Sequence, residues 1–161
     1  GDTTQGMAWL RRLDGQTRTY ALNPAILTEK MVRQEGVVTL WDLPDVLIDM
    51  GQGLPLGYVF PRSGTPVIND VIALVAGARH AEAAQRFIDY VGEDRAQLLA
   101  ARSVFRLPAR SDLPADSVPA WVAEVEREMV VADVDWPLVA REGAAWMAYW
   151  DRRVRGTGRP R

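Results

Sequence analysis

The chain has no cysteine and a single histidine, His80, among its 161 residues. The absence of cysteine excludes disulfides, thiolate metal sites and thiol nucleophiles. One histidine is too few for a zinc site with several imidazole ligands, although oxygen-only sites for hard metal ions remain open. No Gly-x-Ser-x-Gly elbow accompanies His80, so a serine hydrolase triad is not supported. We expect no cofactor.

Long apolar runs and an excess of basic charge are also lacking. No run of 18 or more apolar residues occurs, so no membrane-spanning helix is expected. The formal net charge is −2, which argues against a nucleic acid or an anionic membrane surface as the main partner. The glycines between Gly51 and Gly57 precede an expected strand, whereas a dinucleotide-binding turn opens a helix. A phosphate-binding loop is therefore not predicted.

What is present is a mixture of helical and strand-like patterns. Apolar spacing and capping residues predict helices over 4–13, 24–35, 80–91, 94–102, 121–129 and 138–150, with Gly36 ending the second in a left-handed conformation. Apolar, β-branched runs predict strands over 17–22, 37–41, 54–60 and 67–75. The order of these elements predicts an α/β fold, with a small mixed sheet at the front covered by a helical C-terminal half.

A series of short motifs between Gln34 and Tyr90 carries a family resemblance. In order, they are Gln34-Glu35-Gly36, residues 37–42 (VVTLWD), 53–56 (GLPL), 61–66 (PRSGTP), 70–78 (DVIALVAGA) and 83–90 (AAQRFIDY). This series resembles the type 2 periplasmic solute-binding proteins of ABC importers, nearest the ferric-iron, polyamine and phosphonate branches. Residues 106–110 (RLPAR) resemble the family's returning segment.

The resemblance implies two α/β lobes that close on a small solute. Residues 1–66 would belong to the second lobe, 67–106 would cross to the first lobe, and 107–155 would be helices packing on the second lobe. A basic tail would follow over 156–161. The chain would be the C-terminal portion of such a protein, as a fragment or a reduced domain.

The function implied is capture of a solute for import, with no bond made or broken, and so no enzyme activity. The solute would be an iron complex, a polyamine or a phosphonate-like molecule, delivered to an ABC permease. The location would be periplasmic or extracellular, with any export signal outside this chain. An apolar strand lacking its neighbours would also lead the chain to form a homo-oligomer or to bind a companion first-lobe chain.

Positions matching the family's ligand-binding loops supply the candidate site. Trp41 and Asp42 follow a strand-like run, and an indole beside a carboxylate suits a cationic or amine-bearing solute. A packed indole and a helix-capping aspartate is the alternative. Ser63, Gly64 and Thr65 offer hydroxyl and backbone N–H groups to an oxyanion, or form a hinge turn.

Asn69 and Asp70 interrupt an apolar run, so they need polar partners, either a ligand or a hinge hydrogen bond. Tyr20 is a weaker candidate. Ferric-binding relatives often carry an adjacent tyrosine pair where this chain has Trp41 and Asp42, so iron binding through the usual ligands is in doubt. Two rival functions stay open: a small enzyme using Asp42 with a neighbouring carboxylate, and an interaction domain whose acidic helices dock a partner.

Overall fold

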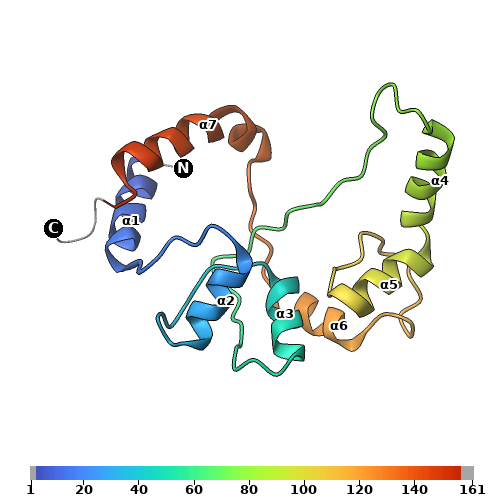
Figure 1. Ribbon diagram of the computed structural model, residues 1–161, viewed down its shortest axis with the longest axis horizontal. Coiled ribbons are helices and arrows are strands. Elements are labelled where there is room, and N and C mark those ends of the chain that lie inside the picture. Colours follow the sequence, from blue (N-terminus) through green and yellow to red (C-terminus); the bar gives the residue numbers. More distant parts are fainter. Residues whose placement is uncertain (1–2, 157–161) are drawn as a thin grey trace. The chain divides into compact units, whose positions relative to one another are not determined.

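The computed structural model describes residues 3–156 and is helical (Figure 1). The helices are α1 (Thr3–Gln16), α2 (Pro24–Val32), α3 (Leu43–Gly51), α4 (Ala81–Val91), α5 (Asp94–Val104), α6 (Ala120–Glu128) and α7 (Trp136–Arg153). Over these residues there is no sheet, and the only β-type pairing is an isolated parallel bridge between Thr65 and Val131. The predicted α/β fold with a small mixed sheet is therefore wrong.

The predicted strands fail because each lacks a neighbour. The runs at 17–22, 37–41, 54–60 and 67–75 are free of helix, and none of them forms a ladder with a second strand. Burial alternates over 54–60, where Leu54, Leu56, Tyr58 and Phe60 are half-buried and the residues between them are exposed. This period of two is that of a strand. Local sequence favours a strand-like backbone, but a sheet also requires a second strand to accept its hydrogen bonds.

Helix boundaries follow local capping chemistry. The Asn23 side chain accepts a hydrogen bond from the backbone N–H of Ile26 at 3.0 Å, and Pro24 occupies the first turn of α2. Asp135 caps α7 in the same way, accepting from Leu138 N at 2.8 Å. These caps satisfy backbone N–H groups that a helix start leaves without partners. The predicted helix at Asn23-Pro24 is confirmed.

Two local predictions around the third helix are wrong. The helix α3 was not predicted, although Pro44 suits its first turn and its hydrophobic residues continue through Ile48. The left-handed residue after α2 is Gln34, with φ of 58°, and Gly36 is not in that conformation. The helix ends at Val32, two residues earlier than the Gln34 turn, so the conformation that favours glycine falls on a glutamine.

The chain forms two units. The first unit comprises residues 1–39 and 134–161 and holds α1, α2 and α7; the second comprises residues 40–133 and holds α3 to α6. The chain therefore passes from one unit to the other twice, after Thr39 and after Asp133. The predicted boundaries at 66/67 and 106/107 both lie inside the second unit. Most of the predicted basic tail, 157–161, lies outside the described residues.

Within the second unit, α5 packs against both α3 and α4. Its Ala101 is buried, as are Val122 and Val125 of α6. The indole of Trp121 donates to the Ala101 carbonyl at 3.2 Å, and its ring meets Phe105 edge-on with centroids 5.7 Å apart. The α5–α6 contact is thus the centre of this unit's core.

The buried core is small for a chain of this composition. Among the described residues, the buried hydrophobic side chains are Ala101, Val122, Val125 and Val154. Many large apolar side chains are exposed, among them Val37 (94% exposed), Val59 (88%) and Val71 (90%). No helix in residues 3–156 is long and apolar enough to cross a membrane. The hydrophobic surface is thus spread over short helices and unpaired segments.

Candidate functional site

Trp41 and Asp42 lie at the start of the second unit, directly before α3. Asp42 is exposed, and its side chain does not cap the helix, although its carbonyl accepts from Val46 N at 3.3 Å. Trp41 is half-buried, and its indole Nε1 is shielded from solvent with no hydrogen-bond partner. An indole N–H can only donate, so this buried atom requires an acceptor that the described chain does not supply.

The segment Ser63-Gly64-Thr65 is held by the parallel bridge to the residues after α6. Thr65 N donates to the Val130 carbonyl at 2.7 Å, and Ala132 N donates to the Thr65 carbonyl at 2.9 Å. Gly64 has φ of 108°, and a Cβ built there would lie 2.9 Å from the Cα of Ala132. Only glycine fits without strain at this close approach of Gly64 to the backbone of Ala132. Ser63 is exposed beside it.

Thr65, like Trp41, has a buried polar side-chain atom, its Oγ1, without a hydrogen-bond partner. Among residues 3–156, Trp41 Nε1 and Thr65 Oγ1 are the two buried side-chain polar atoms in this state. Both belong to the predicted site, and both lie in the second unit. An unpaired buried polar group costs roughly 1–3 kcal/mol, so each atom needs a partner that residues 3–156 do not supply.

Asn69 and Asp70 are both exposed in the second unit. The Asp70 carboxylate pairs with the guanidinium of Arg106, with Oδ2 and Nη1 2.9 Å apart. This ion pair joins the extended run before α4 to the segment after α5. Arg106 belongs to the 106–110 motif, and nothing in the sequence indicates that it pairs with Asp70.

Tyr20 lies in the first unit, apart from the other candidates along the chain. Its hydroxyl donates to Oδ1 of Asp14 at 2.6 Å, and the same oxygen accepts from Gly156 N at 2.8 Å. Asp14 is fully buried, so these charge-assisted hydrogen bonds tie the end of α1 to the residues after α7. The Tyr20 ring meets Trp150 edge-on, with centroids 5.6 Å apart. These contacts hold the Tyr20 side chain within the first unit.

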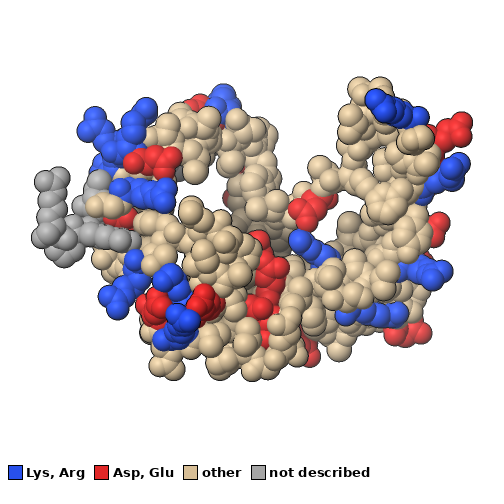
Figure 2. All heavy atoms as spheres, viewed as in Figure 1, with Lys and Arg blue, Asp and Glu red and all other residues tan. Residues whose placement is uncertain are grey.

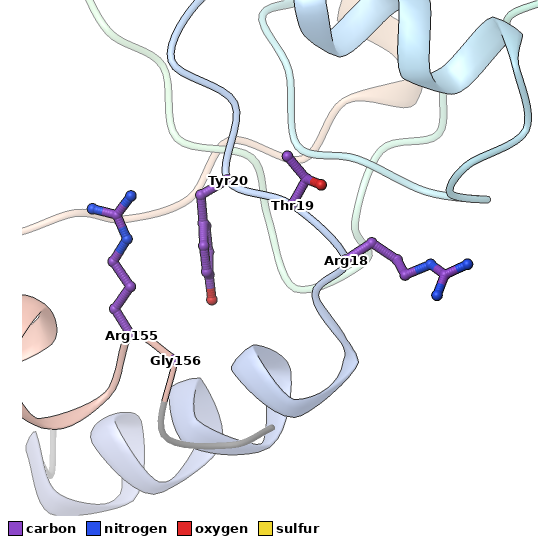
Figure 3. A pocket seen from close by; sticks show the side chains of 5 residues that line it. All are labelled: Arg18, Thr19, Tyr20, Arg155 and Gly156. Carbon is purple, nitrogen blue, oxygen red and sulfur yellow. The ribbon is translucent and has the colours of Figure 1, made fainter. Parts of the chain in front are cut away.

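A cavity of about 360 Å³ lies against Tyr20, lined by Arg18, Thr19, Tyr20, Arg155 and Gly156 (Figure 3). The Arg155 guanidinium stacks over the Tyr20 ring, 5.4 Å from its centroid. Figure 3 shows the Arg18 side chain pointing away from Tyr20, so the two arginines do not converge on one ligand group. The cavity therefore lacks the focused polar groups that orient a bound solute.

Charged groups elsewhere form ion pairs. Arg110 donates to both oxygens of Asp112, at 2.8 and 2.7 Å, and lies 2.9 Å from the Asp94 carboxylate. The hydrogen bonds from Arg110 hold the pKa of Asp112 below its ordinary value. Figure 2 shows both signs of charge distributed over the visible face. No group of three or more metal-ligating His, Cys, Asp or Glu side chains occurs within the described residues.

The structure thus places seven of the eight candidates in the second unit and one, Tyr20, in the first. Asp14 and Ala132 were not predicted to matter at these contacts. An aspartate before a glycine is read as a helix stop, and nothing in the sequence marks its burial. No family model, curated protein or solved structure matches the chain.

Proposed function

We propose that the chain is a solute-binding component of an ABC importer and that its second unit holds the solute. Two features support the proposal. The motif series between Gln34 and Tyr90 resembles that family. The observation that carries it is the unpaired state of Trp41 Nε1 and Thr65 Oγ1, the two buried atoms in the described chain that lack a partner.

The chemistry of these atoms narrows the solute. Trp41 Nε1 is a donor only, and the Thr65 hydroxyl can donate as well as accept. A solute that satisfies the indole must therefore carry an acceptor oxygen, which a phosphonate or a ferric citrate complex has. A fully protonated polyamine has only donors. Asp42, exposed beside Trp41, can pair with an amine on the same solute. A phosphonate bearing an amine carries both kinds of group, acceptor oxygens for the indole and the hydroxyl and a cation for Asp42.

Calorimetric titration tests this function. We expect 2-aminoethylphosphonate, methylphosphonate or ferric citrate to bind, and spermidine and glucose to bind more weakly or not at all. Trp41→Phe keeps the ring and removes the donor, and Thr65→Val removes the hydroxyl at similar size. Each change is expected to weaken binding about tenfold, or roughly 1.4 kcal/mol.

Trp136→Phe is the matched control, because Trp136 is exposed and lies in the first unit. It is expected to leave the affinity unchanged. If no solute of the set binds, or if both second-unit variants bind as the wild type does, the proposal is wrong. Conversion of the solute to a product would instead favour an enzyme that uses Asp42.

A further inference from the structure

Residues 66–74 form the longest run of backbone without hydrogen bonds in the second unit. The backbone N–H and C=O groups of this run have no partner within the described chain, and pairing resumes where Ala78 N donates to the Val75 carbonyl at 3.1 Å. Figure 1 draws the run as an extended coil that leads towards α4. Most of its side chains are exposed, including Ile68 (71%), Val71 (90%) and Leu74 (41%), while Val67 is half-buried.

The backbone of this run offers the same unpaired N–H and C=O groups as a strand at the edge of a sheet. Exposed, apolar, extended backbone pairs readily with another chain. Pairing would satisfy the main-chain groups and remove β-branched side chains from water. Asp70 is the one charge in the run, and Arg106 already neutralises it.

The solvent-accessible surface of the chain indicates how much area a partner could cover. The chain of 17.9 kDa exposes 12,568 Å². Two separate compact units of half this mass would together expose about 9,700 Å², so even without any contact between units the chain exposes roughly 2,900 Å² more. Obligate dimers bury about 2,000–5,000 Å² in total, or about 1,000–2,500 Å² on each chain, so the excess on one chain is at least as large as the share that a permanent partner covers.

We propose that residues 67–75 pair in antiparallel fashion with the same segment of a second copy of this chain, with Val71 opposite Val71. In this register Val67 of one copy faces Val75 of the other, and Ile68 faces Leu74. Apolar residues thus face apolar residues at 67/75, 68/74 and 71/71. Asp70 lies opposite Ile72, whereas an in-register parallel pair would place two Asp70 carboxylates opposite each other, which is unfavourable.

The extended run 54–60 is a poorer candidate. In 54–60, Pro55 has no backbone N–H, and Leu54, Leu56, Tyr58 and Phe60 are already half-buried within the unit. The proposal rests on the unpaired backbone of 67–74 and the exposed apolar side chains of 67–75, and not on solute capture. Its test therefore succeeds or fails independently of the calorimetric one.

Opposite charges introduced at Val71, the residue that faces its own copy, test the proposed antiparallel register. The wild type should have twice the monomer mass by light scattering at micromolar concentration. Val71→Lys and Val71→Glu each place like charges opposite each other, so each variant alone should be a monomer. An equimolar mixture of the two variants should recover the dimer, because Lys then faces Glu.

Val59→Lys is the control, since Val59 is 88% exposed and lies outside the proposed pair. It should remain dimeric, and circular dichroism should show unchanged helix content in every variant. A monomeric wild type would overturn the proposal, whether or not some other chain binds this segment. So would a dimeric Val71→Lys protein, or a mixture that stays monomeric while both variants keep their helices.

Discussion

At the scale of single residues, the crossing of two chain segments depends on Gly64. Its φ of 108° and the distance of 2.9 Å from a built Cβ to the Cα of Ala132 leave no space for a side chain. The neighbouring bridge between Thr65 and Val131 brings the segment before the extended run against the residues after α6. One glycine thus determines how closely these segments approach.

Gly64→Ala is expected to destabilise the protein by about 1–3 kcal/mol, because alanine is strained at this φ and its Cβ meets backbone that moves little. Urea unfolding followed by circular dichroism measures the change. Gly57→Ala is the matched control, since a Cβ there has nothing within 4 Å. Equal stability of the two variants would contradict the close approach.

Tyr20 provides a second prediction at this scale. Tyr20→Phe removes the hydroxyl that donates to the buried Asp14 carboxylate, and it is expected to cost roughly 1.5–3 kcal/mol. Tyr58→Phe is the comparison, because Tyr58 is also half-buried but its ring contact with Phe60 does not need the hydroxyl. If both changes have the same small effect, the Asp14 hydrogen bond contributes little.

The candidate residues illustrate what sequence can predict here. Motif order was enough to select Trp41 and Thr65. It did not reveal that their polar atoms would be buried without partners, because that depends on neighbours distant in sequence. Tyr20 was selected as a ligand residue, yet its hydroxyl bonds to Asp14, whose burial has no local sequence signal.

At the scale of elements, ion pairs join helices to the loops that follow them. Arg110 connects the first turn of α5, through Asp94, to Asp112 in the segment before α6. Since hydrogen bonding from Arg110 lowers the pKa of Asp112 in the folded protein, the interaction stabilises the fold above the unfolded pKa of about 3.9. This contribution is lost as the pH falls through the folded pKa.

Asp112→Asn is therefore expected to lower the urea midpoint at pH 7, where Asp112 is charged. The difference from the wild type should shrink below about pH 4, as the wild-type carboxyl takes up its proton. Asp116→Asn, at an exposed position in the same segment, serves as the control. A difference that stays constant from pH 7 to pH 3 would show that charge at Asp112 does not matter.

Six of the helices were predicted at nearly their observed positions because caps and apolar periodicity are local signals. The mixed sheet was not formed, because pairing requires a neighbouring strand and local preference cannot provide one. The missed helix α3 begins Leu43-Pro44 beside a strand-like run, and proline there was not recognised as a first-turn residue.

At the scale of the whole molecule, many apolar side chains are exposed, and the backbone of residues 66–74 makes no hydrogen bonds within the described chain. A chain that is 48% hydrophobic buries few side chains completely in the described structure. Pairing with a second copy would cover the surface around Val71. Amide exchange over 67–75 should consequently slow as the protein concentration rises, whereas exchange independent of concentration would argue against self-association.

The proposed function depends on the buried indole of Trp41 binding an oxygen of the solute. The most direct measurement is nuclear magnetic resonance of protein labelled with ¹⁵N at the tryptophan indoles, with Trp41→Phe identifying the Trp41 signal. On addition of 2-aminoethylphosphonate, methylphosphonate or gallium citrate in place of the ferric complex, the account predicts a large shift of the Trp41 signal, while those of Trp9 and Trp136 stay fixed. An unchanged Trp41 signal with all three solutes at saturating concentration would contradict it.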